Sequence, residues 1–344
     1  MTKEKKIYFS GTFNGIFDFV NSELKFINDN YEFLERIIRK ISFFKHIFYW
    51  QIIFKLWRGI SIIISEKTNL PFFIHENKLE IEITTDCNMK CNQCDRSCAQ
   101  APSEERMSLY QIKYFIYESI KANKKWPFIV LIGGEPTLHP DIFEITDFFI
   151  EYKLKFSPNT KITISTNGVS RETRNILKKL PYIIHHENSN KKTSKQTKFD
   201  TFNVAPIDVK KYQSPGIDFS RGCNISSLSG TALTRYGFYP CGAGASIDRV
   251  CGLNIGLKSL NDRTERKFRQ QLNTLCKYCG HFKSKEDDVF SLDFISPFWQ
   301  EIYTRYRKEK PALTLYEKPH SVVKYDYEQV IYCRPDHVPD ILGC

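Results

Sequence analysis

Three short apolar or alternating stretches, each followed by a helical pattern, dominate the middle of the chain. The stretch Leu79-Glu80-Ile81-Glu82-Ile83-Thr84 alternates apolar and polar residues with the period of a β-strand, and 128–132 and 161–166 are strand candidates of similar length. Apolar residues at a spacing of three or four predict helices over 108–120, 141–152 and 170–180. Strands that alternate with helices predict a parallel sheet with right-handed crossovers.

The starts of two helices and the second half of the sheet are less regular. Ser108 with Gln111, and Asp141 with Glu144, have the spacing of capping boxes. Beyond residue 181 the helical pattern weakens. Further strands are expected at 182–186, 199–204 and 216–220, with a polar, lysine-rich loop after the first of them. We therefore expect an α/β fold whose second half is abbreviated.

Residues 1–77 do not share this pattern. Residues 31–64 read as one or two helices, and the stretch 43–65 is apolar and aromatic. Lys45, Lys55 and Arg58 interrupt it, and each cation at the centre of a membrane span costs about 3 kcal/mol, which argues against a span. Two alternatives remain: a helix that packs over the end of the α/β core, or a basic, aromatic helix that contacts a membrane surface or a partner.

Composition and charge narrow the class of protein. A chain of 344 residues can bury one large core and carry appendages. The formal net charge of +11 comes from lysines spread along the chain rather than from one basic tract, so we expect no nucleic-acid partner. The 11 cysteines are clustered, and the opening residues lack the pattern of a secretory signal. We therefore expect a reducing, cytoplasmic location.

A cysteine loop directly follows the first expected strand. Cys87, Cys91 and Cys94 have C-x3-C-x2-C spacing, which places three thiolates on one tight loop. Thiolates suit iron-sulfur sites, and three of them leave the fourth iron of a 4Fe-4S cluster open. A structural zinc site would need a fourth ligand nearby. After the second strand comes Gly133-Gly134-Glu135-Pro136, whose glycines allow backbone to approach a ligand closely.

Together these two motifs resemble the signature of the radical S-adenosylmethionine (radical SAM) enzymes. The resemblance implies a partial (β/α)6-type barrel, with SAM chelating the open iron. It also implies that Gly133, Gly134, Glu135 and Pro136 contact the methionine portion of SAM, and that Ser165 and Asn167 lie near it. His185, His186 and Glu187 lie where the family places polar contacts to SAM or substrate, although an ordinary strand end would look the same.

A second set of cysteines lies further along the chain at Cys223, Cys241, Cys276 and Cys279. Residues 229–240 predict a β-hairpin that brings the first two thiols together. The set resembles the twitch module, the short form of the SPASM domain, which implies one auxiliary 4Fe-4S cluster. A four-cysteine zinc site is the structural alternative. Cys251 could replace Cys223 as a ligand, Cys98 is expected to be a neighbour of the first set, and Cys333 and Cys344 are expected to be free thiols.

The resemblance implies reductive cleavage of SAM to a 5′-deoxyadenosyl radical, which takes hydrogen from a small-molecule or peptide substrate. A fully ligated auxiliary cluster would favour net oxidation, with a flavodoxin- or ferredoxin-type electron donor as partner. One alternative is a peptide maturase that makes a crosslink or an epimer. An alternative of another class is a noncatalytic iron-sulfur or zinc scaffold. Arg221 and Arg235 could orient an anionic substrate or simply be surface cations.

These expectations divide the chain into four parts. They are a helical N-terminal extension over 1–77, a radical SAM partial barrel over 78–220, a twitch-like auxiliary domain over 221–290, and a C-terminal tail over 291–344 that packs on the barrel.

Overall fold

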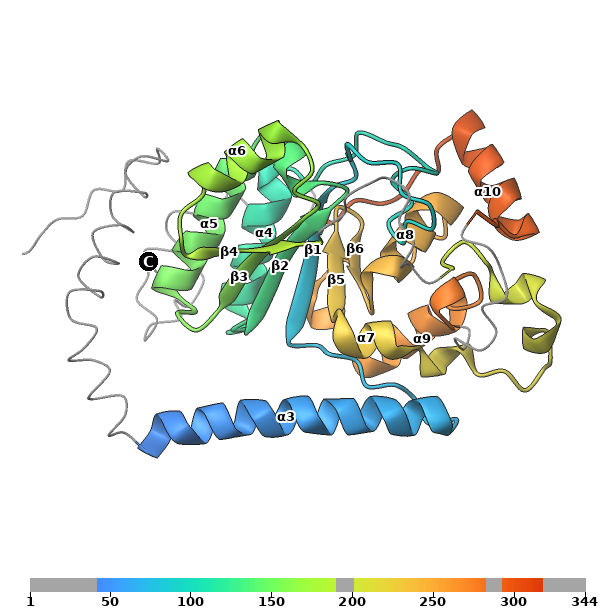
Figure 1. Cartoon of the computed structure of the whole chain (residues 1–344), viewed down its shortest axis with the longest axis horizontal. Helices are drawn as coiled ribbons and strands as arrows, with labels where there is room; N and C mark the ends of the chain where they lie inside the picture. Colours follow the sequence, from blue (N-terminus) through green and yellow to red (C-terminus); the bar gives the residue numbers. More distant parts are fainter. Residues whose placement is uncertain (1–41, 190–200, 283–292, 318–344) are drawn as a thin grey trace, which may run out of the picture.

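The computed structural model describes residues 42–189, 201–282 and 293–317, in which one mixed sheet is the central element (Figure 1). The sheet has six strands in the order β4-β3-β2-β1-β5-β6. The strands are β1 (Lys78–Thr84), β2 (Phe128–Gly133), β3 (Lys161–Thr166), β4 (Ile184–Asn188), β5 (Thr231–Thr234) and β6 (Gly237–Tyr239). All neighbouring pairs are parallel except β5 with β6, which is antiparallel. The predicted α/β fold with a mostly parallel sheet is confirmed.

The first half of the fold follows the predicted alternation of strands and helices. The connecting helices are α4 (Leu109–Lys121), α5 (Ile142–Lys155) and α6 (Arg171–Lys179), which lie together beside β1 to β4 (Figure 1). Leu79, Ile81 and Ile83 project from β1 into the core that this layer forms with Ile112 and Phe115 of α4. The other face of the sheet therefore carries the polar residues of the same strands, because side chains alternate along a strand.

The two predicted helix starts differ in outcome. Ser108 caps α4 in a complete capping box with Gln111, as predicted. Asp141 precedes α5 but makes no capping hydrogen bond through its side chain, so the second predicted capping box is wrong. The backbone N–H of Asp141 instead donates to Nδ1 of His139 at 3.1 Å. The His139 ring thus accepts the hydrogen bond that Glu144 would accept from the Asp141 N–H in a capping box.

The second half of the fold packs around β5 and β6. Its helices are α7 (Asn224–Leu228), α8 (Gly242–Cys251), α9 (Glu265–Leu275) and α10 (Pro297–Lys308). Short 3-10 helices cover Pro136–Leu138, Pro206–Asp208, Lys210–Tyr212, Phe219–Arg221, Leu260–Asp262 and Gly280–Phe282. A second apolar core joins Ile247 of α8 to Trp299 and Tyr303 of α10. The predicted hairpin is present, but β5 pairs with β1, so the boundary proposed at residue 221 runs through one sheet.

Two of the predicted strands are wrong. Residues 201–204 form turn and irregular structure, and residues 216–220 form a turn that leads into a 3-10 helix. Thr201, Phe202, Asn203 and Val204 are all buried, so the apolar side chains of Phe202 and Val204 reflect burial rather than a strand. Their backbone is paired by other means: the N–H of Asn203 donates to the side chain of Gln93, and the N–H of Ser296 donates to the carbonyl of Asn203.

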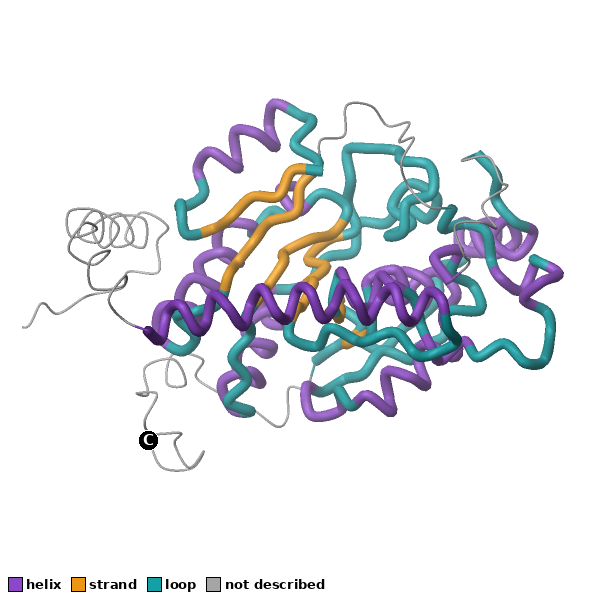
Figure 2. Tube along the Cα trace, turned by 60° about the horizontal axis from the view of Figure 1, so that its bottom comes forward, coloured by secondary structure: helices purple, strands orange, loops and turns teal. Residues whose placement is uncertain are grey.

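Helix α3 (Ser42–Lys67) precedes the sheet and runs along the edge where the parallel strands begin (Figures 1 and 2). The part of the predicted helix before residue 42 lies outside the described residues. The guanidinium of Arg221 donates to the carbonyls of Ser65 and Thr68 at 2.6 and 3.0 Å, and Trp57 packs edge-on against Phe73. Arg221 therefore holds α3 in place. No helix within the described ranges is long and apolar enough to span a membrane.

Asp147, on the buried side of α5, makes the stability of the fold depend on pH. Burial, with Glu144 and Glu151 nearby, raises the pKa of Asp147 to about 7. The folded state therefore holds this proton more tightly than the unfolded chain, and the carboxyl's contribution to stability is lost as the pH rises through 7. We expect Asp147→Asn to remove a slope of up to about 1.4 kcal/mol per pH unit between about pH 5 and 7. Urea unfolding of both proteins across this range measures it, and parallel stability curves would contradict it.

Candidate functional site

The first cysteine set lies on the irregular segment after β1. Cys91 is buried, and Cys87 and Cys94 are half-buried. The segment is closed where the N–H of Met107 donates to the carbonyl of Ile83 at 2.9 Å. Inside the loop, the side-chain amide of Gln100 donates to the carbonyl of Cys91 at 2.9 Å. The loop thus leaves the carboxyl end of β1 in a fixed shape, where ligands bind in folds of this kind.

The Gly-Gly-Glu segment lies directly against this loop. The N–H of Gly134 donates to the carbonyl of Thr84 at 2.9 Å, and the N–H of Glu135 donates to the carbonyl of Asp86 at 2.7 Å. A Cβ atom on Gly133 would lie 2.1 Å from the Thr84 oxygen, and one on Gly134 would lie 2.1 Å from the Asp86 oxygen. Only glycine permits this close approach. The two sequence motifs are therefore side by side in space.

The Glu135 side chain is fully buried and holds two strand ends together. Its carboxylate accepts hydrogen bonds from the hydroxyl of Thr137 at 2.8 Å, the hydroxyl of Thr166 at 2.9 Å, and the N–H of Asn167 at 2.8 Å. It also accepts one from the Thr137 N–H at the start of the 3-10 helix that includes Pro136. This carboxylate is a positioning group, and the sequence analysis had named Glu135 only as a contact to SAM.

Asn167 connects the third strand to the cysteine loop. Its side-chain N–H donates to Oδ1 of Asn88 at 2.8 Å, and Asn88 directly follows Cys87.

Ser165 is half-buried on β3 and pairs with Glu187 of β4, and Thr163 pairs with His185. These four residues share one face of the sheet, whereas His186 pairs with Ile164 on the other face. The structure therefore separates His186 from its two neighbours.

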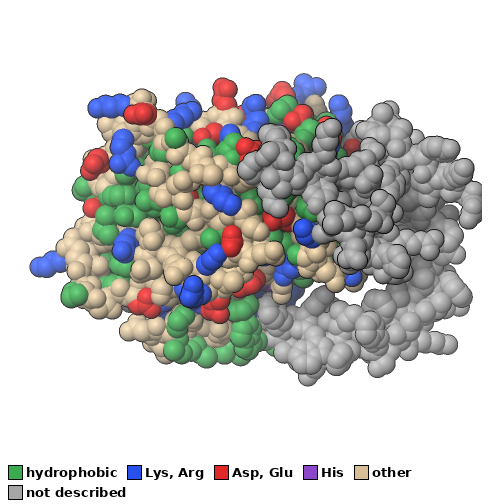
Figure 3. All heavy atoms as spheres, turned by 180° about the vertical axis from the view of Figure 1, so that it is seen from behind, with side chains coloured by type: hydrophobic (Ala, Val, Ile, Leu, Met, Phe, Trp, Pro, Cys, Tyr) green, Lys and Arg blue, Asp and Glu red, His purple; other side chains and the backbone are tan. Residues whose placement is uncertain are grey.

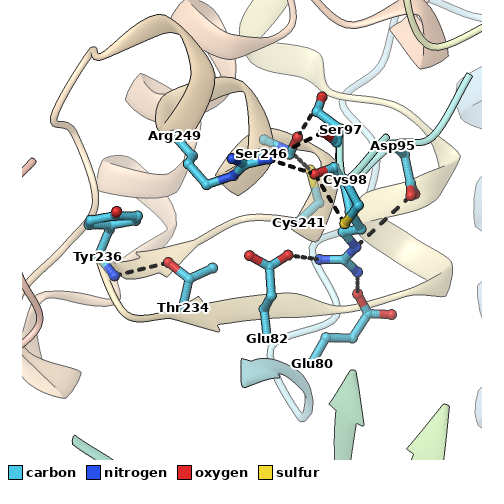
Figure 4. A network of polar contacts seen from close by, with 12 residues as sticks. Glu80, Glu82, Asp95, Ser97, Cys98, Thr234, Tyr236, Cys241, Ser246 and Arg249 are labelled. Carbon is cyan, nitrogen blue, oxygen red and sulfur yellow. Dashed lines mark hydrogen bonds and ion pairs between the residues drawn. The ribbon is translucent and has the colours of Figure 1, made fainter. Parts of the chain in front are cut away.

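A buried ionic network lies beneath the cysteine loop, and the sequence analysis missed it (Figure 4). Arg96 lies two residues after Cys94 and donates to the carboxylate of Glu80 at 2.5 Å; its other terminal nitrogen lies 3.6 Å from the carboxylate of Glu82. Both carboxylates project from β1 and are 6% exposed. Burial raises the pKa of each, and the Arg96 cation opposes that rise. The alternating pattern of β1 is typical of a half-exposed strand, so the sequence carried no signal of this network.

Arg96 also packs against the second cysteine set. A Cβ atom on Gly242 would lie 1.8 Å from a guanidinium nitrogen of Arg96, and Gly242 directly follows Cys241. Further along α8, Arg249 donates to the carbonyls of Arg96 and Ala101 at 3.1 and 3.0 Å. Helix α8 and the first cysteine loop are therefore joined through buried guanidinium groups, and Arg96 lies between the two sets.

The second cysteine set lines one small cavity. Cys223 and Cys241 precede α7 and α8, whereas Cys276 ends α9 and Cys279 precedes a 3-10 helix. All four line the cavity with the apolar side chains of Ile225, Ala243, Ile247, Leu272 and Leu275. Burial, and then the neighbouring Cys223, raises the pKa of the Cys241 thiol to about 12. Because burial opposes ionisation of these thiols, thiolates at this position would need a bound cation to stabilise them. Four thiolates are the ligands that an iron-sulfur cluster requires, so the four cysteines fit such a cluster.

The remaining cysteines differ in position. Cys251 ends α8 and is not among the residues that line this cavity. Cys98 is buried, and its hydrogen bond to Cys94 lowers the pKa of the Cys94 thiol to about 7. Cys333 and Cys344 lie outside the described residues. Over the described ranges, no three His, Cys, Asp or Glu side chains are grouped closely enough to hold one metal ion.

Comparison with known proteins finds a family model that is similar to part of the chain. Residues 81–186 match the sequence model of the Radical SAM superfamily. This segment begins within β1, ends within β4, and contains the cysteine loop and Gly133-Gly134-Glu135. The chain is also 30% identical over 87 residues to an AdoMet-dependent heme synthase from Methanosarcina barkeri (strain Fusaro / DSM 804). That similarity spans 25% of this chain and 23% of the relative.

Two solved structures are also among the matches. BtrN in complex with AdoMet and 2-DOIA is 16% identical, with a TM-score of 0.39 over 64% of this chain and 98% of that one. Streptococcus suis SuiB bound to precursor peptide SuiA is 21% identical, with a TM-score of 0.25 over 37% of this chain and 27% of that one.

Proposed function

We propose that this chain is a radical SAM enzyme that cleaves SAM reductively and removes hydrogen from a substrate. The observation that carries the proposal is the contact between the cysteine loop and the Gly-Gly-Glu segment. Two backbone hydrogen bonds, from Gly134 to Thr84 and from Glu135 to Asp86, fix it. The family match covers both segments.

In this proposal Cys87, Cys91 and Cys94 hold a 4Fe-4S cluster with one open iron. When bound, such a cluster supplies one electron to the sulfonium of SAM. Gly133, Gly134 and Glu135 present backbone to the methionine portion of SAM, because the Glu135 side chain is engaged within the protein. Asn167 keeps the cysteine loop in position through Asn88. Ser165 and Pro136 border the same site.

We further propose that Cys223, Cys241, Cys276 and Cys279 hold an auxiliary 4Fe-4S cluster and that the reaction is a net oxidation. Support comes from the four thiols that line one apolar cavity, joined to the first loop through Arg96 and Gly242. The substrate is a small molecule or a peptide side chain. A flavodoxin- or ferredoxin-type donor and a cytoplasmic location belong to the same proposal.

Iron content separates the two cysteine sets. We expect anaerobically reconstituted protein to hold about eight irons, because each cubane contains four. A Cys87→Ala, Cys91→Ala, Cys94→Ala variant and a Cys241→Ala, Cys276→Ala variant should each hold about four. With a chemical reductant, the first variant should not cleave SAM, whereas the second should retain cleavage. Iron and sulfide analysis, EPR and detection of 5′-deoxyadenosine make these measurements.

Cys251→Ala is the matched control, because Cys251 is buried on α8 but does not line the cavity. It should keep about eight irons. Zinc in place of iron at the second set would overturn the auxiliary cluster and the net oxidation. If the first cluster is intact but SAM is not cleaved, the proposal that the chain is an enzyme is wrong, and a noncatalytic scaffold is favoured.

A further inference from the structure

Helix α3 has the reverse of the usual orientation for a helix at a protein surface. Ser65 is only 3% exposed, and Arg58, Ser61 and Ile62 are half-buried, so the side of α3 that faces the body of the protein is largely polar. Leu56 and Ile60 are 62% and 57% exposed. Surface helices ordinarily bury their apolar stripe and expose the polar one.

The exposed apolar residues form one continuous face. Leu56, Ile60 and Ile63 recur at spacings of four and three, which places them above one another on a helix. Trp57 and Ile64 flank them at 48% and 45% exposure. Hydrophobic side chains accordingly gather along the lower edge of the molecule, where α3 runs (Figure 3). A contiguous exposed patch of this kind is typical of a surface that contacts another protein or a membrane.

The net charge of α3 favours an anionic membrane over a second copy of the chain as the surface that covers its exposed face. Between Ser42 and Lys67 the helix contains four cations, Lys45, Lys55, Arg58 and Lys67, and one anion, Glu66, so its net charge is +3. A second copy of the same face would bring like charges together. Anionic lipid headgroups would neutralise them. Lys55 and Arg58 near the middle of the helix make a spanning position costly, by about 3 kcal/mol each.

We propose that α3 lies on an anionic membrane surface, with Leu56, Ile60 and Ile63 at the boundary between headgroups and acyl chains. Helix α3 follows the edge where the parallel strands begin, whereas the cysteine loop follows the carboxyl end of β1 (Figure 1). This attachment leaves the candidate site facing away from the membrane. The proposal does not depend on the proposed function.

Vesicle flotation of the reconstituted full chain tests it. We expect binding to phosphatidylcholine vesicles that contain roughly 30% phosphatidylserine, much weaker binding to pure phosphatidylcholine, and release at high ionic strength. A Leu56→Gln, Ile60→Gln, Ile63→Gln variant should bind at least about tenfold more weakly, because three apolar side chains no longer enter the boundary.

The control is a Leu154→Gln, Tyr182→Gln variant, whose substituted residues are 39% and 83% exposed on other elements. It should bind like the wild type. Circular dichroism checks that both variants fold, and the salt series on the wild type needs no variant. Equal binding by the Gln variant of α3, or equal binding to neutral vesicles, overturns the proposal. No vesicle binding also overturns it, and a dimer in light scattering would then assign the face to a second copy.

Discussion

Replacing Glu135 with glutamine should lower the free energy of unfolding by about 3 kcal/mol and reduce SAM binding. The carboxylate is fully buried and accepts hydrogen bonds from Thr137, Thr166 and Asn167. Hydrogen bonds to a charged group contribute about 1.5–3 kcal/mol each, and a buried donor left unpaired costs about 1–3 kcal/mol. A glutamine amide would present N–H groups to donors that need an acceptor. The backbone N–H groups of Thr137 and Asn167 donate to different oxygens of Glu135, and an amide has only one oxygen, so one of these two N–H groups loses its partner.

The structural consequence should reach the cysteine loop. The N–H of Glu135 donates to Asp86 of that loop, and the side chain of Asn167 donates to Asn88. Loss of the hydrogen bond between Glu135 and Asn167 should therefore weaken both of these contacts to the loop. Denaturant unfolding of equally reconstituted proteins measures the stability, and equilibrium binding measures SAM affinity. Glu144→Gln is the matched control, since Glu144 is exposed on α5, and its effect should stay within about 0.5 kcal/mol. If both variants unfold at the same denaturant concentration, the positioning role of Glu135 is wrong.

Local patterns predicted the first half of the fold because its determinants are local. Each of the strands β1, β2 and β3, and each helix between them, has a hydrophobic pattern that can be recognised within the element itself. The capping box at Ser108 needs only four residues. The same reasoning failed at 199–204. Phe202 and Val204 are buried, and the backbone N–H of Asn203 donates to the side chain of Gln93 rather than to a neighbouring strand.

The candidate site was predictable where a motif combines residue type with spacing. Cys87, Cys91 and Cys94, with the Gly-Gly-Glu segment, are such motifs, and the two loops do meet in space. The buried ion pairs were not predictable, because Arg96 reaches Glu80 and Glu82 only through the path of an irregular loop. The exposed face of α3 was also hidden from sequence, since an apolar helix does not reveal which of its sides meets the protein.

The second large effect should come from Arg96→Met, which we expect to lower the free energy of unfolding by about 3–5 kcal/mol. The change removes the cation that pairs with Glu80 and Glu82, both 6% exposed, and an unpaired charge in the interior is strongly destabilising. It also removes the guanidinium that packs against Gly242. Because Gly242 follows Cys241 and Arg96 follows Cys94 by two residues, we expect iron content to fall at both cysteine sets.

Arg106→Met is the matched control, because Arg106 lies on the same segment and pairs with Asp86 at a side-chain exposure of 39%. An exposed pair of this kind contributes at most about 1 kcal/mol. A second test combines Arg96→Met with Glu80→Gln, which removes one of the two stranded charges. The double variant should recover part of the lost stability, whereas Glu80→Gln alone should destabilise the wild type, and this change of sign is an interaction energy between the two residues. Equal losses for Arg96→Met and Arg106→Met, or no recovery in the double variant, would show that Arg96 contributes by filling space and that the two cysteine sets are joined by packing alone.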